Sequence, residues 1–303
     1  MKKTFYANGK LLITAEYLVL DGAKALALPT KFGQFLDVEK CNNQQIVWQS
    51  FDYDGTLWFE DTIDFQEISN YNKNENNNVK NTLIAILHHA YILNPDFLKL
   101  ADGYKITTRL TFPKSWGLGT SSTLISTIAQ WLQIDAYKLL NNSFGGSGYD
   151  IACAQNNHPI VYHLVDKEPI IESASFNPQF SEHLYFVYLN KKQNSKEAIA
   201  SYRKKENDLV QIIPVINQIT DSLLQTTELA VFIDLLVQHE NLLSEILGIK
   251  PVKKLLFPDF NGAIKSLGAW GGDFILVAAS ENPTDYFVKK GHATIIRFKD
   301  MVL

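Results

Sequence analysis

Alternating and periodic apolar residues divide the chain into short strands and amphipathic helices. Residues 104–112 alternate strictly between apolar and polar side chains, which predicts a half-buried strand. Apolar residues recur at helical spacing over 79–93 and 122–133, and they cover one broad face of 229–247, so we predict a helix over each segment. Short apolar runs before residue 40 predict further strands, which Gly22 and the Pro29–Gly33 stretch separate: Leu11–Ile13, Tyr17–Leu20, Ala25–Leu28 and Phe35–Val38.

The pattern of strands and helices changes near Leu184. Upstream, an Asp54-Gly55 turn signal lies between two strands, and the asparagine-rich segment Asn70–Asn81 predicts an exposed loop. Downstream, helices predominate. We therefore expect an α+β fold in two lobes, with an N-terminal domain over 1–180 and a C-terminal domain over 181–303. The remaining predicted elements are strands at Leu184–Leu189, Phe274–Ala278 and Thr294–Phe298, a turn over 141–149, and helices at Asp150–Ala154, Ile199–Asn207 and Leu209–Leu224, the last interrupted or kinked at Pro214.

Composition limits the classes of protein to which the chain can belong. Hydrophobic residues make up 46% of the 303 residues, which is enough for a sizeable core. The net charge of −4 gives no basic excess for binding a nucleic acid. The two cysteines, Cys41 and Cys153, exclude a disulfide framework and a four-cysteine zinc site. Because the first residues lack a signal peptide's apolar core and no apolar run reaches about 18 residues, we expect a soluble, cytoplasmic protein.

The segment Pro113–Thr123 links a predicted strand to a predicted helix and is rich in glycine and hydroxyl residues. Gly117 and Gly119 permit positive φ angles that turn several backbone N–H groups toward one point. Thr120–Ser122 places hydroxyls where the start of a helix already attracts anions. The segment therefore fits a phosphate chain, and a serine hydroxyl can reach its Mg²⁺; a turn that merely caps the helix is an equal alternative. It has neither the lysine of a Walker loop nor the spacing of a dinucleotide fingerprint.

Three further segments carry candidate chemistry. Gly145–Asp150 is a flexible turn that presents one carboxylate as a base or metal ligand, although a helix cap is the favoured alternative on these residues alone. Lys265–Asp273 is a glycine-rich turn that enters a strand. Asn8-Gly9-Lys10 precedes the first strand, where an isolated lysine is usually a solvated charge. The histidines match no metal-binding pattern, and Gly145–Tyr149 misses the GxSxG of serine hydrolases.

The order and separation of these segments resemble the GHMP kinases, the family of galactokinase, homoserine kinase, mevalonate kinase and phosphomevalonate kinase. Gly9–Gly22 is similar to the family's GK-(apolar)-GE(H/Y) opening, and Pro113–Thr123 to its P-x-x-x-GLGSS-A phosphate loop. Gly146–Ala152 is similar to the GSGxD that carries the catalytic Asp, and Lys265–Asp273 to the C-terminal glycine loop. The mevalonate and phosphomevalonate branch is the most similar, in a subgroup with a Gly-Tyr-Asp-Ile-Ala stretch. His239–Gly248 resembles that branch's C-terminal helix.

The resemblance implies an ATP- and Mg²⁺-dependent kinase, with an N-terminal lobe like ribosomal protein S5 domain 2 and a ferredoxin-like C-terminal lobe. Asp150 would orient or deprotonate the acceptor, and Lys10 would hold Asp150 and offset charge during phosphoryl transfer. Ser121 would bind Mg²⁺. The acceptor would be a small anion of the mevalonate pathway, phosphomevalonate or mevalonate. The other implied site residues fall into three sets. The ATP-binding residues are Lys114, Gly117, Leu118, Gly119, Thr120, Ser121 and Ser122, and the residues of the glycine loop are Gly268, Ala269, Gly271 and Gly272. The residues that would contact the acceptor are Glu16, Ser147, Lys192 and Ser195.

Some residues depart from the family pattern. Ala15 and Trp270 stand where glycine or alanine is usual, and Leu139 stands where mevalonate kinase has a magnesium-binding Glu. Asp273 resembles phosphomevalonate kinases and favours a phosphorylated acceptor. Two alternatives stay open: a non-catalytic homologue that binds ATP or a metabolite as a sensor, and an ATP-dependent decarboxylase of diphosphomevalonate. We expect neither a nucleic-acid nor a membrane partner, and a homodimer is left open.

Overall fold

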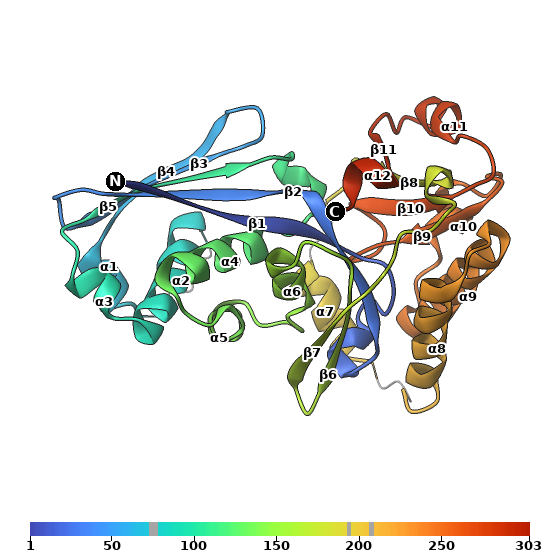
Figure 1. Cartoon of the computed structure of the whole chain (residues 1–303), viewed down its shortest axis with the longest axis horizontal. Coiled ribbons are helices and arrows are strands. Elements are labelled where there is room, and N and C mark those ends of the chain that lie inside the picture. The colour runs from blue at the N-terminus through green and yellow to red at the C-terminus, as the bar shows by residue number, and fades with distance from the viewer. Residues whose placement is uncertain (73–77, 193–194, 206–208) are drawn as a thin grey trace. The chain divides into compact units, whose positions relative to one another are not determined.

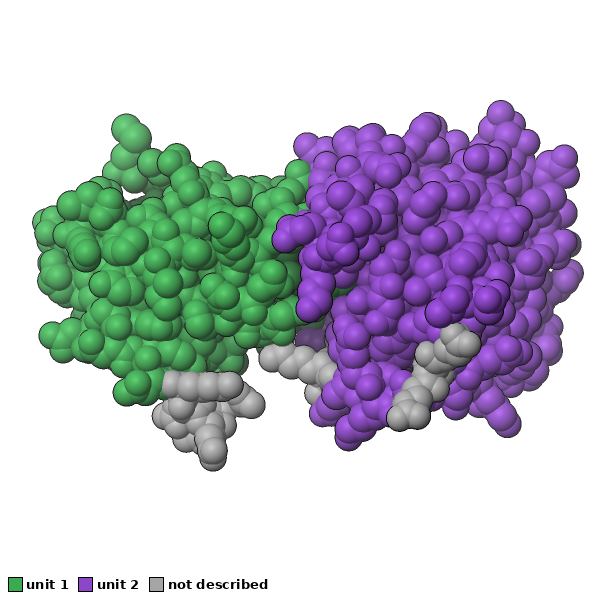
Figure 2. All heavy atoms as spheres, turned by 90° about the horizontal axis from the view of Figure 1, so that it is seen from below, with its two compact units in different colours: residues 1–9, 32–114, 118–155 green, residues 10–31, 115–117, 156–303 purple. Residues whose placement is uncertain are grey.

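The structure, a computed structural model, divides into two compact units. It describes residues 1–72, 78–192, 195–205 and 209–303. Each unit is built from segments that are distant in sequence, and the predicted domain boundary near residue 180 stays a prediction. Unit 1 comprises 1–9, 32–114 and 118–155, and unit 2 comprises 10–31, 115–117 and 156–303 (Figure 2).

Unit 1 is a sheet with helices on one face (Figure 1). Its strand β3 (Gln45–Phe51) pairs with β4 (Leu57–Asp64) in an antiparallel hairpin and with β5 (Tyr104–Leu110) in parallel. The other edge of β5 pairs antiparallel with Gln34–Lys40. The inward side chains of the sheet pack with the helices into one apolar core. The helices are α1 (Phe65–Ser69), α2 (Val79–Leu93), α3 (Asp96–Lys99), α4 (Thr120–Leu132), α5 (Ala136–Ser143) and α6 (Tyr149–Gln155). The 3₁₀ turn η2 (Lys114–Trp116) starts at the last residue of a unit 1 segment, and its other two residues belong to unit 2.

Unit 2 contains a four-stranded antiparallel sheet, in the order β11-β8-β10-β9, and a hairpin of β6 and β7. The hairpin pairs through β6 with Ala25–Ala27. Two long strands, β1 (Lys2–Leu12) and β2 (Ala25–Lys40), contribute residues to both units. The other elements are η1 (Leu18–Asp21), β6 (Ile160–Val165), β7 (Glu168–Ser173), η3 (Ser181–His183), β8 (Leu184–Tyr188), α7 (Ser195–Arg203), α8 (Ile212–Gln225), α9 (Leu229–Leu247), α10 (Val252–Leu256), β9 (Ala263–Ser266), β10 (Phe274–Ala278), α11 (Thr284–Lys289), β11 (Ile295–Arg297) and α12 (Phe298–Met301).

The predicted α+β class is confirmed, and three predicted elements match to the residue. They are the helices α2 and α9 and the strand β10. Gly248 ends α9 with a φ of 61°, the left-handed conformation that glycine adopts without a steric penalty. Strong periodicity therefore predicted these boundaries well.

Two predictions in the first forty residues are wrong. Of the predicted strand Tyr17–Leu20, the last three residues lie in the 3₁₀ turn η1. Tyr17 precedes this turn with a φ of 67°, which an extended strand does not allow. Pro29–Gly33, predicted to separate two strands, lies inside the continuous strand β2. The proline lies between the part of β2 that pairs with β6, Ala25–Ala27, and the part that pairs with β5, Gln34–Lys40, so its missing N–H removes no hydrogen bond from either pairing. Its carbonyl accepts a hydrogen bond from the N–H of Leu303 at 3.1 Å.

Two more predictions need correction, and parts of two others lie outside the described residues. Pro214 does not interrupt α8, because it occupies the helix's first turn, where no backbone hydrogen bond is lost. The predicted turn over 141–149 begins later, because α5 continues to Ser143. Residues 73–77 of the predicted asparagine-rich loop and Glu206-Asn207 of a predicted helix lie outside the described residues. Among the residues that are described, no helix is long and apolar enough to cross a membrane.

Candidate functional site

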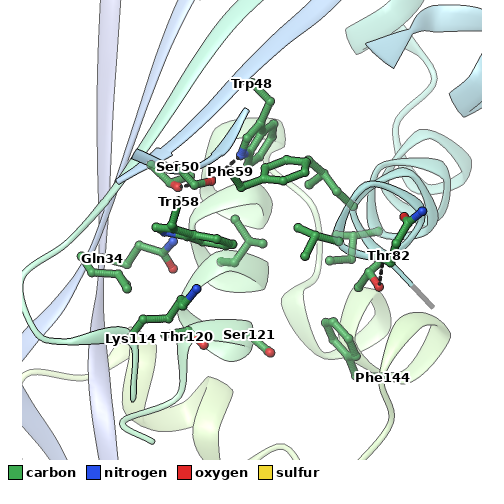
Figure 3. A pocket seen from close by; sticks show the side chains of 17 residues that line it. Gln34, Trp48, Ser50, Trp58, Phe59, Thr82, Lys114, Thr120, Ser121 and Phe144 are labelled. Atoms are coloured by element: carbon green, nitrogen blue, oxygen red, sulfur yellow. Dashed lines mark hydrogen bonds between the residues drawn. The ribbon is translucent and has the colours of Figure 1, made fainter. Parts of the chain in front are cut away.

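A cavity of about 250 Å³ opens inside unit 1 (Figure 3). Its walls come from the β3–β4 hairpin, from α2 and from the start of α4. Four aromatic side chains line it: Trp48, Trp58, Phe59 and Phe144. The indole N–H of Trp48 donates to Ser50 Oγ at 3.0 Å, which fixes that wall of the cavity. Aromatic walls of this kind suit a flat, apolar ring.

Lys114, predicted to contact ATP, lies at this cavity. Its ammonium nitrogen is 4.2 Å from the centroid of the Trp58 ring, a cation–π contact. Its backbone N–H donates to Asp52 Oδ1 at 3.0 Å, so the end of β3 holds the start of the glycine-rich loop. The cavity therefore combines an apolar wall with a cation at one side.

The first turn of α4 forms another wall of the cavity, through Thr120 and Ser121. The helix is preceded by Gly119, whose φ is 94° and which has no side chain to cap the first N–H groups. Ser122 is 1% exposed and its hydroxyl donates to the Gly119 carbonyl at 2.8 Å, while Leu118 is fully buried. Of these predicted ATP-binding residues, Thr120 and Ser121 thus line the cavity, while Leu118 and the Ser122 side chain are buried.

Gly117, the other predicted glycine of this loop, belongs to unit 2. Its φ is 69°, and the Nζ of Lys10 is 3.4 Å from its carbonyl oxygen. A Cβ at this position would lie 2.4 Å from the carboxylate carbon of Asp273. Only glycine fits such an approach. Lys10 and Asp273, from two separate motifs, therefore both lie against Gly117.

The glycine loop, which lies within the segment Lys265–Asp273, forms a tight turn between β9 and β10. Gly268 and Gly271 have φ angles of 58° and 79°, and Trp270, at 56°, shares the conformation that glycine adopts most easily. Trp270 is 3% exposed. The indole thus fills buried space within unit 2. Ala269 and Gly272 complete the turn, and the contact of these residues with a nucleotide stays a prediction.

Glu16, predicted to contact the acceptor, is buried at 1% exposure. Its carboxylate accepts a hydrogen bond from the ammonium of Lys265. The neighbouring Ala15 has a φ of 60°, which explains physically why glycine is usual at that position of the motif. In this arrangement Glu16 faces a protein cation, and an acceptor contact stays a prediction.

Asp150 is half-buried and lies in the first turn of α6, which directly follows the glycine turn in the sequence. Gly145 and Gly146 have φ angles of 67° and 117°, so the turn needs glycine for its backbone even though side chains would find open space. Ser147 is half-buried beside it. Asp150 belongs to unit 1 and Lys10 to unit 2, and their predicted pairing stays a prediction.

Two of the residues predicted to bind the acceptor, Lys192 and Ser195, lie at the start of α7 or just before it. Lys192 is exposed, and Ser195 is the first residue of α7. Arg203, the last residue of α7, pairs with Asp21 at 3.2 Å. Among the described residues, no group of three or more His, Cys, Asp or Glu side chains could hold a metal. The acceptor contacts of Lys192 and Ser195 stay predictions.

Sequence reasoning missed the aromatic walls and Asp52. Trp48 and Trp58 lie ten residues apart on two paired strands, a signal that a hairpin carries two indoles, but no local motif marks a cavity. It also missed Tyr137, whose hydroxyl is buried. Burial is the main cause that raises the pKa of this phenol, and the nearby Asp150 acts in the same direction, so the phenol stays protonated.

No family model and no curated protein matches the sequence, but solved structures match nearly the whole chain. The Streptococcus pneumoniae phosphomevalonate kinase in complex with phosphomevalonate and AMPPNP is 15% identical, with a TM-score of 0.73 over 97% of this chain and 99% of that one. The Methanococcus jannaschii mevalonate kinase is 19% identical, with a TM-score of 0.69 over 96% and 94%. The Lactococcus lactis galactokinase complexed with galactose is 12% identical, with a TM-score of 0.68 over 95% and 88%.

These similarities establish the fold. The similar structures are kinases of the GHMP type, and the predicted two-lobed GHMP kinase fold is confirmed. At identities of 12–19% the likeness carries no substrate with it. The residues of this chain must therefore carry the argument for a function.

Proposed function

We propose that the protein is an ATP-dependent kinase that phosphorylates a small molecule. The observation that carries this proposal is the aromatic cavity of unit 1, whose wall includes the first turn of α4. A nucleotide needs both features at once: a flat apolar site for the base and an electropositive site for the phosphates.

The nucleobase would stack in the cavity against Trp58 and Phe59. The Trp58 indole N–H is buried and has no hydrogen-bond partner among the described residues, so an acceptor atom of the base would satisfy it. The phosphates would extend to the backbone N–H groups at the start of α4, which Gly119 leaves uncapped, and to the Lys114 ammonium. The cavity and the phosphate site thus share one wall.

Mg²⁺, when bound with the nucleotide, neutralises charge that develops on the transferred phosphoryl group. Ser121 suits it, because its side chain is exposed at the start of α4, whereas the Ser122 hydroxyl is engaged with Gly119. Hard oxygen donors of this kind are the ligands that Mg²⁺ prefers. We therefore assign the protein's magnesium contact to Ser121.

Asp150 would orient the acceptor and take up its proton, and Lys10 would stabilise charge as the phosphoryl group moves. An alcohol acceptor depends on that base, whereas a phosphate acceptor is already ionised and depends on it less. We propose mevalonate or phosphomevalonate as the acceptor, because the motifs resemble that branch, and one similar structure is a phosphomevalonate kinase in complex with phosphomevalonate. Lys192 and Ser195 would receive its anionic group.

A second candidate is a non-catalytic homologue that binds ATP as a sensor. The buried Trp270 favours it, because a bulky indole occupies a loop that needs glycine-like backbone angles. The kinase would phosphorylate an acceptor, whereas the sensor would bind ATP without phosphorylating any acceptor.

An ADP-release assay separates them. Purified protein with Mg·ATP is tested against mevalonate, phosphomevalonate, diphosphomevalonate, galactose and homoserine. We expect turnover with mevalonate or phosphomevalonate. Binding of Mg·ATP without turnover of any acceptor would support the sensor, and release of CO₂ and phosphate from diphosphomevalonate would identify a decarboxylase.

A further inference from the structure

A cluster of buried charges lies in unit 2, apart from the aromatic cavity. It comprises Glu16, His239, Glu240, Lys265 and Ser266, each no more than 3% exposed, and we call it the buried charge cluster. The Lys265 ammonium donates to Glu16 and lies 3.4 Å from Glu240 Oε2. Glu240 also accepts the N–H of Ser266 at 3.1 Å and its hydroxyl at 2.5 Å. Three separate segments of the chain therefore meet at one ammonium.

The cluster carries two carboxylates and one cation. His239 adds no charge, because its Nε2 accepts the N–H of Ala15 at 2.9 Å and burial lowers its pKa well below the usual value. Burial also raises the pKa of Glu16 to about 7, although Lys265 acts in the opposite direction. Among the described residues, Lys265 is the cation that contacts both carboxylates. Removing it would leave buried negative charge without compensation.

The cluster fastens the turn that follows β1. Ala15 and Tyr17 have φ angles of 60° and 67°, which strain a residue with a side chain, so neighbouring contacts must hold them there. His239 binds the N–H of Ala15, and Lys265 binds the carboxylate of Glu16, which lies between the two strained residues. The turn is thus fixed from α9 and from β9.

The same ammonium contacts the glycine loop 268–273. The Nζ of Lys265 is 5.5 Å from the centroid of the Trp270 ring, and Trp270 is buried with a φ of 56°. Lys265 itself lies on β9, shortly before this loop. One side chain therefore touches both the turn at 14–17 and the loop at 268–273.

Each of the two segments is connected along the chain to a residue that contacts Gly117. Upstream of the turn, the Lys10 ammonium is 3.4 Å from the Gly117 carbonyl, and at the end of the loop the Asp273 carboxylate lies against the Gly117 α-carbon. A shift of either segment would move a group that faces the proposed phosphate-binding loop.

We infer that Lys265 is a positioning residue, which acts through Glu16 and Trp270 to hold the turn at 14–17 and the glycine loop in the arrangement that phosphoryl transfer requires. This inference rests on the proposed function for its consequence in catalysis. The physical linkage of the two segments by Lys265 is independent of it.

The test replaces the ion pair of Glu16 and Lys265 and measures the amide exchange of the segments 14–17 and 268–273. Lys265→Met leaves two buried carboxylates and can fail to fold, so the main variant is Glu16→Gln/Lys265→Met, which removes one charge of each sign. Lys253→Met is the matched control, because it also removes a lysine of unit 2 that donates to a backbone carbonyl, that of Gly262 at 2.6 Å. Hydrogen exchange of the amides in 14–17 and 268–273 is measured by mass spectrometry.

We expect exchange in both segments to accelerate about tenfold in the double variant and to stay at the parent rate in the control. Unchanged exchange in either segment would overturn the linkage. Where the parent turns over an acceptor, kcat should fall about 10²-fold through misplacement. The dissociation constant for Mg·ATP should change less than kcat, because the cavity proposed for the base is lined by residues of unit 1 alone. An unchanged kcat with accelerated exchange would overturn the positioning role, whereas a parent without kinase activity would refute the proposed function alone, since the exchange rates still decide the linkage.

Discussion

In unit 1, Lys114, Ser121 and Asp150 keep part of their surface accessible, whereas in unit 2 Glu16, Glu240 and Lys265 are no more than 3% exposed. Both groups lie in segments that resemble GHMP kinase motifs. Accessible groups can meet a ligand, while buried ions must be compensated by one another. The difference teaches that a motif residue can serve the site either by contact or by holding the backbone. Substitutions should separate the two classes, because the first should change activity without changing stability, and the second should reduce stability as well as activity.

The largest effect should come from Asp150→Asn, in the accessible region. With an alcohol acceptor, turnover should fall about 10²–10⁴-fold because general-base catalysis is lost. The melting temperature and circular dichroism should match those of the parent. A smaller fall would indicate a phosphate acceptor, and full activity on the best substrate would remove Asp150 from the catalytic residues.

In the buried region, Lys265→Met should chiefly reduce stability. We expect the free energy of unfolding to fall by about 3–5 kcal/mol, because two buried carboxylates lose their cation. Lys253→Met loses one hydrogen bond to a carbonyl and should cost about 1 kcal/mol. Urea denaturation measures both. Equal losses in the two variants would contradict the special role of the buried charge cluster.

Trp58→Ala should weaken nucleotide binding without changing the fold. Loss of the stacking face should raise the dissociation constant for Mg·ATP about tenfold. Trp58→Phe keeps an aromatic face and should bind within about threefold of the parent. Isothermal titration calorimetry compares the three proteins. Parent affinity in Trp58→Ala would place the base elsewhere.

The smallest expected effect is a change in pH dependence on replacing Glu16 by Gln. The folded-state pKa of Glu16, about 7, lies above the ordinary 4.5, so its contribution to stability is full below pH 4.5 and is lost as the pH rises through 7. Glu16→Gln should therefore flatten the decline of the melting temperature over this range. A decline as steep as that of the parent would show that Glu16 stays ionised.

The elements that the sequence predicted well are those whose periodicity is local. The pattern over 229–247 specifies α9 and its end at Gly248, because one apolar face and one glycine suffice. The strand β9 was not predicted, because Lys265 and Ser266 look polar in sequence. They are buried only because carboxylates from two distant segments compensate them.

The candidate site divides in the same way. The glycine-rich loop before α4 was predicted, because the conformations of Gly117 and Gly119 follow from their residue type. The cavity beside it was not, since Trp58 and Phe144 lie far apart in sequence and only the fold brings them to one cavity. A cavity is a property of the packing of several elements, and no single segment specifies it.

The central claim is that a nucleotide binds at the cavity and at the start of α4. The most direct test is the melting temperature with and without Mg·ATP, in the parent and in Gly119→Val. Gly291→Val is the matched control, because Gly291 also has a positive φ, 87°, and a side chain there meets open space. Ligand that binds only the folded protein stabilises it, so Mg·ATP should raise the melting temperature of the parent and the control but not that of Gly119→Val. An equal rise in all three would contradict the account, because it would show that ATP binds away from the start of α4.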